Sequence, residues 1–284
     1  MQRYTEGQYT NWQKISLPKN FSLERTLTCG QTFRITEKGG TFIYVRGQSV
    51  IALRTEKDGL LFSVYGENVS KEKLKEILGI NDDIERINRE LIKRVPQFEK
   101  VIDDTLGIRI MRQEPFETAI SFIFSVQSAI PLIRRRLDAL AKIAGKEIET
   151  PFGTFNLFPV SSALKSLSNE EIKSLKLGFR EKWFEEFTEK YDEKKMDAIA
   201  KLPFEEKEKA LLKIKGVGIK VAHCIMLFSM NELSAFPVDV WIKRGMEKLF
   251  GIKGTTQKIT KEGRNLFGPF AGYAQEYIYF YMRR

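Results

Sequence analysis

Short runs rich in β-branched and aromatic residues fill the first quarter of the chain. Four of them lie at residues 32–36, 41–45, 50–54 and 60–65. Gly39-Gly40 separates the first two runs and Asp58-Gly59 the last two, and both dipeptides are typical of tight hairpin turns. The pattern therefore predicts an antiparallel sheet.

The hydrophobic period changes to that of a helix after Ser70. Ile84, Ile87 and Leu91 recur at helical spacing, and helical patterns then dominate to the end of the chain. Residues 95–98 interrupt them, as does an expected loop at residues 151–159. We predict an α+β fold, with an N-terminal antiparallel β-sheet domain and flanking helices at residues 1–100, followed by a mostly α-helical domain at residues 101–284.

Two of the predicted helices meet at a glycine turn. Residues 204–214 and 221–228 flank Gly216-Val217-Gly218. Glycines permit a tight turn and leave backbone N–H groups open to an anion. The unit is a helix-hairpin-helix, and we expect it to grip a DNA phosphate.

Lys220 closes this turn, and Asp239 follows the second helix. A helix running to about Met230 carries the chain roughly 15 Å away, and the extended stretch that follows can span up to about 30 Å, so Asp239 can return to the lysine. A lysine attacks as a nucleophile only when neutral, and a helix start with apolar neighbours favours that form. The alternatives are a phosphate contact for Lys220 and a helix N-cap for Asp239, which is compatible with catalysis.

Composition points to a polyanionic partner and a reducing compartment. The 284 residues include 47 Lys and Arg against 37 Asp and Glu, a net charge of +10. Cys29 and Cys224 are too few for an iron–sulfur cluster with four protein thiolates. Since no long apolar run exists and Met1–Gly7 has no secretion-signal core, we expect an intracellular protein, cytoplasmic in a prokaryote and nuclear in a eukaryote.

Residues 216–224 and 237–240, which contain Lys220 and Asp239, resemble the helix-hairpin-helix glycosylase superfamily in its 8-oxoguanine DNA glycosylase branch. Similar segments at residues 29–34, 112–117, 177–180 and 271–275 extend the resemblance over nearly the whole chain. It implies two helical lobes with a catalytic cleft between them. It also implies a bifunctional enzyme that flips out and excises 8-oxoguanine from duplex DNA through a Schiff base on Lys220, with Asp239 stabilising the developing charge, and then nicks the abasic site by β-elimination.

The same resemblance implies a pocket for the flipped base. Gly30 matches a glycine whose carbonyl accepts from N7–H of 8-oxoguanine, and Gln275 matches a glutamine that bonds the Watson–Crick edge. Tyr279, one helical turn later, matches a stacking aromatic, and Cys224 should cover the other face of the base near Pro237. The alternatives are a simple turn for the glycine and core packing for the tyrosine and the cysteine.

Departures from the animal-type enzymes affect the contacts with DNA. Gln127-Ser128 and Leu132 stand where those enzymes carry an asparagine pair and an arginine that read the opposite cytosine, so we expect a relaxed choice of cytosine. Phe179 replaces a wedging tyrosine, and Trp241 stands where a phosphate-binding histidine is common. The DNA-binding residues implied in this way are Gly216, Val217, Gly218, Gln127, Ser128, Phe179, Arg180 and Trp241.

The resemblance implies no required cofactor and no catalytic metal, although the hairpin carbonyls could bind a structural monovalent cation. It implies a monomer that acts on double-stranded DNA containing oxidised guanine, without a membrane. His223 is expected to be structural or to face DNA. Two alternative functions are a monofunctional alkylpurine DNA glycosylase, which normally lacks the lysine, and a non-catalytic helix-hairpin-helix DNA-binding protein, which needs no base pocket.

Overall fold

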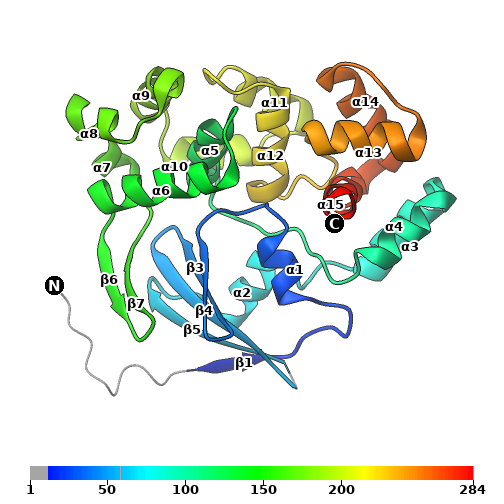
Figure 1. Ribbon diagram of the computed structural model, residues 1–284, viewed down its shortest axis with the longest axis horizontal. Coiled ribbons are helices and arrows are strands. Elements are labelled where there is room, and N and C mark those ends of the chain that lie inside the picture. Colours follow the sequence, from blue (N-terminus) through cyan, green and yellow to red (C-terminus); the bar gives the residue numbers. More distant parts are fainter. Residues whose placement is uncertain (1–11, 58, 284) are drawn as a thin grey trace.

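In the computed structural model, residues 12–57 and 59–283 are described. The segment Met1–Gly7, where the sequence predicts no secretion signal, lies outside these ranges, as does Asp58 of the second hairpin signal. The sheet occupies one side of the molecule and most helices occupy the other (Figure 1). The arrangement confirms the predicted α+β class.

The N-terminal sheet has five antiparallel strands in the order β1-β5-β4-β3-β2. Their bounds are β1 (Gln13–Ile15), β2 (Ile35–Lys38), β3 (Thr41–Arg46), β4 (Ser49–Glu56) and β5 (Gly59–Gly66). Gly39 and Gly40 both have positive φ and close the predicted hairpin between β2 and β3, where Lys38 pairs with Thr41. The four predicted strands are present, although the first begins at Ile35, three residues later than predicted. Strand β1 was not predicted, because three residues are too few to show a period.

Helices make up most of the remaining chain. In chain order they are α1 (Leu23–Thr28), α2 (Lys71–Ile77), α3 (Ile84–Arg94), α4 (Glu99–Asp104), α5 (Pro115–Ser125), α6 (Ile130–Ala144), α7 (Ser161–Lys165), α8 (Asn169–Ser174), α9 (Glu181–Lys190), α10 (Glu193–Ala200), α11 (Phe204–Leu212), α12 (Ile219–Ser229), α13 (Val240–Phe250), α14 (Thr256–Phe267) and α15 (Ala271–Met282). Short 3₁₀ turns lie at Pro96–Phe98, Gly178–Arg180 and Gly268–Phe270.

The expected loop at residues 151–159 is wrong in part. The strands β6 (Glu147–Thr150) and β7 (Gly153–Asn156) form a hairpin there. Ile148 and Leu157 belong to a small core that they share with the outer face of the N-terminal sheet. Such short strands carry little periodic signal, and contact with the sheet stabilises them.

Side-chain packing crosses the domain boundary predicted near residue 100. Ile84 and Leu91 of α3, and Cys29 and Phe33 from the N-terminal region, belong to the large helical core. In the other direction, the β6–β7 hairpin packs on the sheet. The division at residue 100 remains a prediction, and the two regions share hydrophobic cores.

Helices α5 and α15 both pack closely against α12. Phe122 of α5 stacks on Phe228 of α12, with ring centroids 5.8 Å apart. Gly272 of α15 faces Leu227 of α12 so closely that a Cβ at this glycine would collide with the leucine side chain. Helices α5, α12 and α15 thus meet around one space, and each contributes a wall of the site.

Candidate active site

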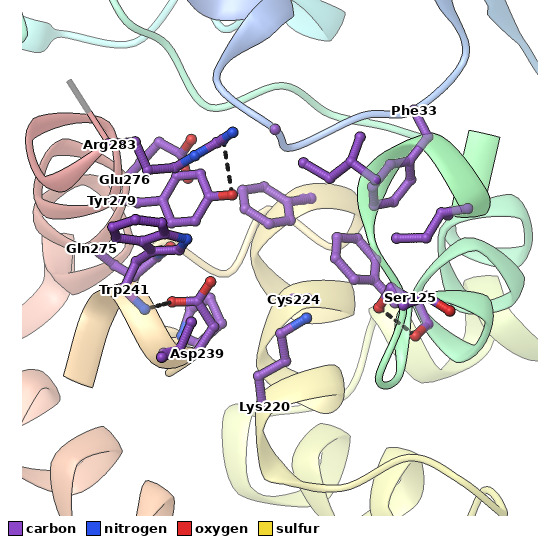
Figure 2. A pocket seen from close by; sticks show the side chains of 18 of the residues that line it. Phe33, Ser125, Lys220, Cys224, Asp239, Trp241, Gln275, Glu276, Tyr279 and Arg283 are labelled. Carbon is purple, nitrogen blue, oxygen red and sulfur yellow. Dashed lines mark hydrogen bonds between the residues drawn. The ribbon is translucent and has the colours of Figure 1, made fainter. Parts of the chain in front are cut away.

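A cavity of about 360 Å³ lies where these three helices meet the loop after α1 and the start of α13. Its walls combine side chains from segments far apart in the sequence, and Figure 2 shows them converging on a common space. The volume is in the range of small-molecule sites in proteins. The cavity is therefore the candidate pocket for a flipped base.

Lys220 lies in the first turn of α12, whose N-cap is Gly218. Its side chain lines the cavity (Figure 2). Its amine lies 5.1 Å from the centroid of the Phe122 ring. The amine therefore lies near the partial positive charge of the helix start and over the electron-rich face of the Phe122 ring. The predicted phosphate-binding turn therefore ends in an amine that faces the pocket, as the spacing predicts.

Asp239 is the N-cap of α13 and also lines the cavity. Its Oδ1 accepts from the backbone N–H groups of Trp241 and Ile242, each at 2.9 Å. Both bonds use the same oxygen and fix the orientation of the carboxyl group. The cap predicted as an alternative role is present, and it presents the carboxyl to the same pocket as the lysine.

Gly30 and Tyr279 lie against each other in the wall of the cavity. Gly30 has a φ of 103°, and a Cβ there would lie 3.2 Å from Cε1 of Tyr279. The Tyr279 hydroxyl accepts a bond from Arg283 at 3.0 Å. Gln275 is buried one helical turn before Tyr279, and within the described ranges its Oε1 has no hydrogen-bond partner. That amide is positioned to pair with a ligand.

Cys224 of α12 also lines the cavity. Burial raises the pKa of its thiol to about 11, while the nearby Lys220 lowers it. The thiol is therefore protonated at neutral pH and acts as a small apolar surface. Pro237 lines the same cavity, so every residue predicted for catalysis or base binding lies in one pocket. Their roles remain predictions.

The glycine turn before α12 has the geometry predicted for it. Gly216 has a φ of 83°, and a Cβ there would collide with the ring of Trp183. At Gly218 no atom lies within 4 Å of an added Cβ, so the backbone is open on that side. The Val217 side chain is buried, which leaves only its backbone for contact with DNA.

Comparisons with known proteins agree with this geometry. A family model for the N-terminal domain of 8-oxoguanine DNA glycosylase matches residues 14–119. The chain is 31% identical to the Clostridium acetobutylicum 8-oxoguanine glycosylase/lyase, solved in complex with double-stranded DNA containing cytosine opposite 8-oxoguanine. That match covers 97% of this chain and 98% of the other, with a TM-score of 0.88. This chain belongs to the 8-oxoguanine DNA glycosylase family.

Other proteins with lower sequence identity also match nearly the whole chain. An Arabidopsis thaliana protein named N-glycosylase/DNA lyase OGG1 is 27% identical over 91% of this chain and 76% of its own length. A probable N-glycosylase/DNA lyase of Methanothermobacter thermautotrophicus is 26% identical over 93% of this chain and 94% of its own. A 3-methyladenine DNA glycosylase from Archaeoglobus fulgidus, at 18% identity and a TM-score of 0.79, shares the fold.

Of the residues predicted to contact DNA in this family member, some line the cavity and others lie exposed outside it. Ser128 and Trp241 line the cavity, and Gln127 is exposed with a φ of 50°. Phe179 lies outside the cavity, 51% exposed, with its ring 5.0 Å from that of Trp183. A large exposed aromatic ring beside the glycine turn is suited to intercalation.

Arg180 lies differently from its neighbour. It is 5% exposed and donates to the backbone carbonyls of Val126, Gln127 and Leu177. Its guanidinium thus holds the loop that carries Gln127. The predicted DNA-binding role of Arg180 remains a prediction, and a residue that is 5% exposed would act on DNA through this loop.

Sequence reasoning missed two residues of the glycosylase pocket, Glu276 and Arg283. Both line the cavity. Arg283 could have been found, because it lies one helical turn after Tyr279 and its guanidinium lies over that ring, 5.0 Å from the centroid. Glu276 carries no such signal, because adjacent residues of a helix point about 100° apart. Only the tertiary structure shows that Gln275 and Glu276 both line the cavity.

His223 has a structural position in this glycosylase fold. It is fully buried, its Nδ1 accepts from the backbone N–H of Phe236 at 2.9 Å, and its Nε2 lies 2.7 Å from Glu208. No group of three or more His, Cys, Asp or Glu residues in the described part of the chain could hold a metal ion. The helices within residues 12–57 and 59–283 include none with the length and apolar character to cross a membrane.

Proposed function

We propose that this protein excises 8-oxoguanine from duplex DNA and then cleaves the abasic strand, with Lys220 as the nucleophile and Asp239 as the stabilising carboxylate. The observation that carries the proposal is the common pocket. Lys220, at the start of α12, and Asp239, at the start of α13, line one cavity with Gly30, Gln275 and Tyr279. A simple phosphate grip would need no such pocket.

In the proposed first step, the flipped nucleotide displaces water around Lys220, which favours the neutral amine. The amine attacks C1′, the C1′–N9 bond breaks, and the base leaves with the bonding electrons and takes up a proton. Positive charge develops on the sugar in the transition state, and the Asp239 carboxylate stabilises it. The two N–H bonds to this carboxyl hold it in place during the reaction.

In the second step, the sugar ring opens and the lysine–sugar adduct becomes a Schiff base, which acidifies the C2′ protons. Removal of one such proton expels the 3′ phosphate and nicks the strand. Hydrolysis of the Schiff base then frees the amine of Lys220. Lyase activity is thus a chemical consequence of an amine nucleophile.

Base recognition in this proposal uses complementary polar groups. The Gly30 carbonyl accepts from N7–H of the oxidised base, which ordinary guanine lacks. The Oε1 of Gln275, which has no partner among the described residues, accepts from the Watson–Crick edge. Tyr279 and Cys224 cover the two faces of the ring. A buried donor or acceptor left without a partner is costly, so guanine is disfavoured.

On the DNA side, we propose that Phe179 wedges into the duplex and that Gly216 and Gly218 hold a phosphate. Leu132 is 37% exposed and has no guanidinium to read cytosine, so the opposite base is selected only weakly. A monovalent cation on the hairpin carbonyls fits this open turn and would add charge against the phosphate. The protein would act as an intracellular monomer.

Borohydride trapping tests the amine mechanism directly. Reduction of the Schiff base on a duplex with one 8-oxoguanine should link protein to DNA, and Lys220→Gln should abolish the adduct. A matched control is Lys73→Gln, which removes a lysine paired with Glu76 on the surface of α2. This control should trap at the normal rate.

Other outcomes would lead to different functions. Base release without any adduct, dependent on Asp239, would indicate a glycosylase that uses water. Binding of the lesion with neither an adduct nor base release would indicate a DNA-binding module. An adduct that persists in Lys220→Gln would place the nucleophile elsewhere.

A further inference from the structure

We propose that Glu276 is a substrate-positioning residue of the base pocket that binds a proton when the oxidised base enters. The inference rests on the function proposed above and deepens it. Glu276 directly follows Gln275 on α15, near Tyr279 and Arg283 (Figure 2). It lines the cavity together with Gly30 and Tyr279. No step of the excision reaction uses this second carboxyl group.

The position of Glu276 is unfavourable for a charge. The residue is 2% exposed, and its Oε1 has no hydrogen-bond partner within the described ranges. A buried carboxylate with an unpaired oxygen is costly, whereas a protonated carboxyl is less so. Burial raises the pKa of Glu276 to about 7, so both forms are populated at neutral pH.

The groups around Glu276 come from four elements. Asp239 at the start of α13 raises the pKa of Glu276, while Arg283 on its own helix and a hydrogen bond from Cys29 after α1 lower it. Burial raises the pKa of Cys29 well above its ordinary value and that of Cys224 on α12 to about 11, so both thiols stay neutral. The charges that act on Glu276 near pH 7 are therefore those of Asp239 and Arg283.

Entry of a flipped nucleotide favours the protonated form of Glu276. The base excludes water and the DNA brings phosphate charge, and both disfavour a second carboxylate beside Asp239. A protonated carboxyl also gains an O–H donor, which can pair with a purine carbonyl oxygen, whereas a carboxylate can only accept. The protonated form is thus the one that binds the lesion.

Cys29 links this proton to the neighbouring Gly30. The thiol has one proton and two acceptors within reach, the Thr26 carbonyl at 3.3 Å and the Glu276 carboxyl. When Glu276 is protonated, the thiol keeps its bond to Thr26 and holds the turn that presents the Gly30 carbonyl. When Glu276 is ionised, the thiol donates its hydrogen bond to the carboxylate in place of the Thr26 carbonyl, which loosens that turn.

The test measures lesion preference against pH without chemistry. In the Lys220→Gln protein, fluorescence anisotropy gives the Kd for a duplex with one 8-oxoguanine and for the same duplex with guanine, between pH 6 and pH 8. For one group with a pKa of about 7, the preference should fall about tenfold over this range, because the competent form is lost as pH rises. Adding Glu276→Gln, which keeps a neutral side chain, should make the preference independent of pH.

A matched control is Glu72→Gln, which removes one negative charge from a side chain that is 76% exposed on α2. It should keep the tenfold fall. A fall that persists with Glu276→Gln, or a preference that does not change in the parent protein, would overturn the inference. So would a preference that increases with pH, because the ionised form would then be the competent one.

Calorimetry keeps the inference testable if Glu276→Gln does not fold. Binding of the 8-oxoguanine duplex to the Lys220→Gln protein at pH 7, in buffers of different ionisation enthalpy, should take up about half a proton more than binding of the guanine duplex. Equal proton uptake would refute the inference. Borohydride trapping in the protein with Lys220 intact reports separately on the proposed function, so the two failures are distinguishable.

Discussion

Asp239→Asn separates the two roles that the structure gives to one side chain. Asparagine keeps an Oδ1 that can accept from the N–H groups of Trp241 and Ile242, so the cap of α13 should survive. Only the negative charge is lost from the pocket. Asp239→Ala, in comparison, removes the charge and the cap together.

The magnitudes differ enough to be measured. Loss of a carboxylate at a helix start costs about 0.3–1 kcal/mol, so Asp239→Asn should lower Tm by no more than about 4 °C in a chain of this size. Asp239→Ala should cost about 1 kcal/mol more, since the cap is lost. Loss of charge stabilisation at the sugar should slow excision at least about 100-fold in both variants.

Thermal melting and single-turnover excision from an 8-oxoguanine duplex measure the two effects separately. We expect Asp239→Asn to be nearly as stable as the parent and almost inactive. If this variant excised the base at close to the parent rate, the charge of Asp239 would not be needed. If it were as unstable as Asp239→Ala, the cap would depend on the charge and not on the oxygen.

Three further substitutions test the glycine turn and the contacts with DNA. Gly216→Ala should destabilise the protein by about 1–3 kcal/mol in thermal melts, because its positive φ and the ring of Trp183 both oppose a Cβ. Gly218→Ala, where space is open, should leave stability within about 1 kcal/mol but weaken DNA binding in anisotropy titrations; equal effects of the two variants on stability would contradict this geometry. Leu132→Arg should raise excision opposite cytosine relative to the other three bases by about 10-fold, and an unchanged ratio would show that the arginine cannot reach the base from α6.

The features determined by the sequence are those that depend on neighbouring residues. The glycine turn, the placement of Lys220 in the first turn of α12 and the cap by Asp239 all follow from local backbone geometry and hydrogen bonding, and the structure contains each of them. The strands β2 to β5 were predictable for the same reason, since runs of β-branched and aromatic residues and the hairpin signals between them act over a few residues. The resemblance to known glycosylases added the likeness of Gly30 and Gln275 to base-binding residues.

The tertiary structure decided what depends on contacts between distant segments. Arg180 is buried because backbone carbonyls of another loop accept hydrogen bonds from its guanidinium. The β6–β7 hairpin is stabilised by its contact with the sheet. Glu276 joins the pocket because α15 packs closely on α12, which carries this carboxyl to Cys29 and Asp239. Burial and electrostatic surroundings are properties of the assembled fold, so the ionisation of such a group cannot be read from its neighbours in the sequence.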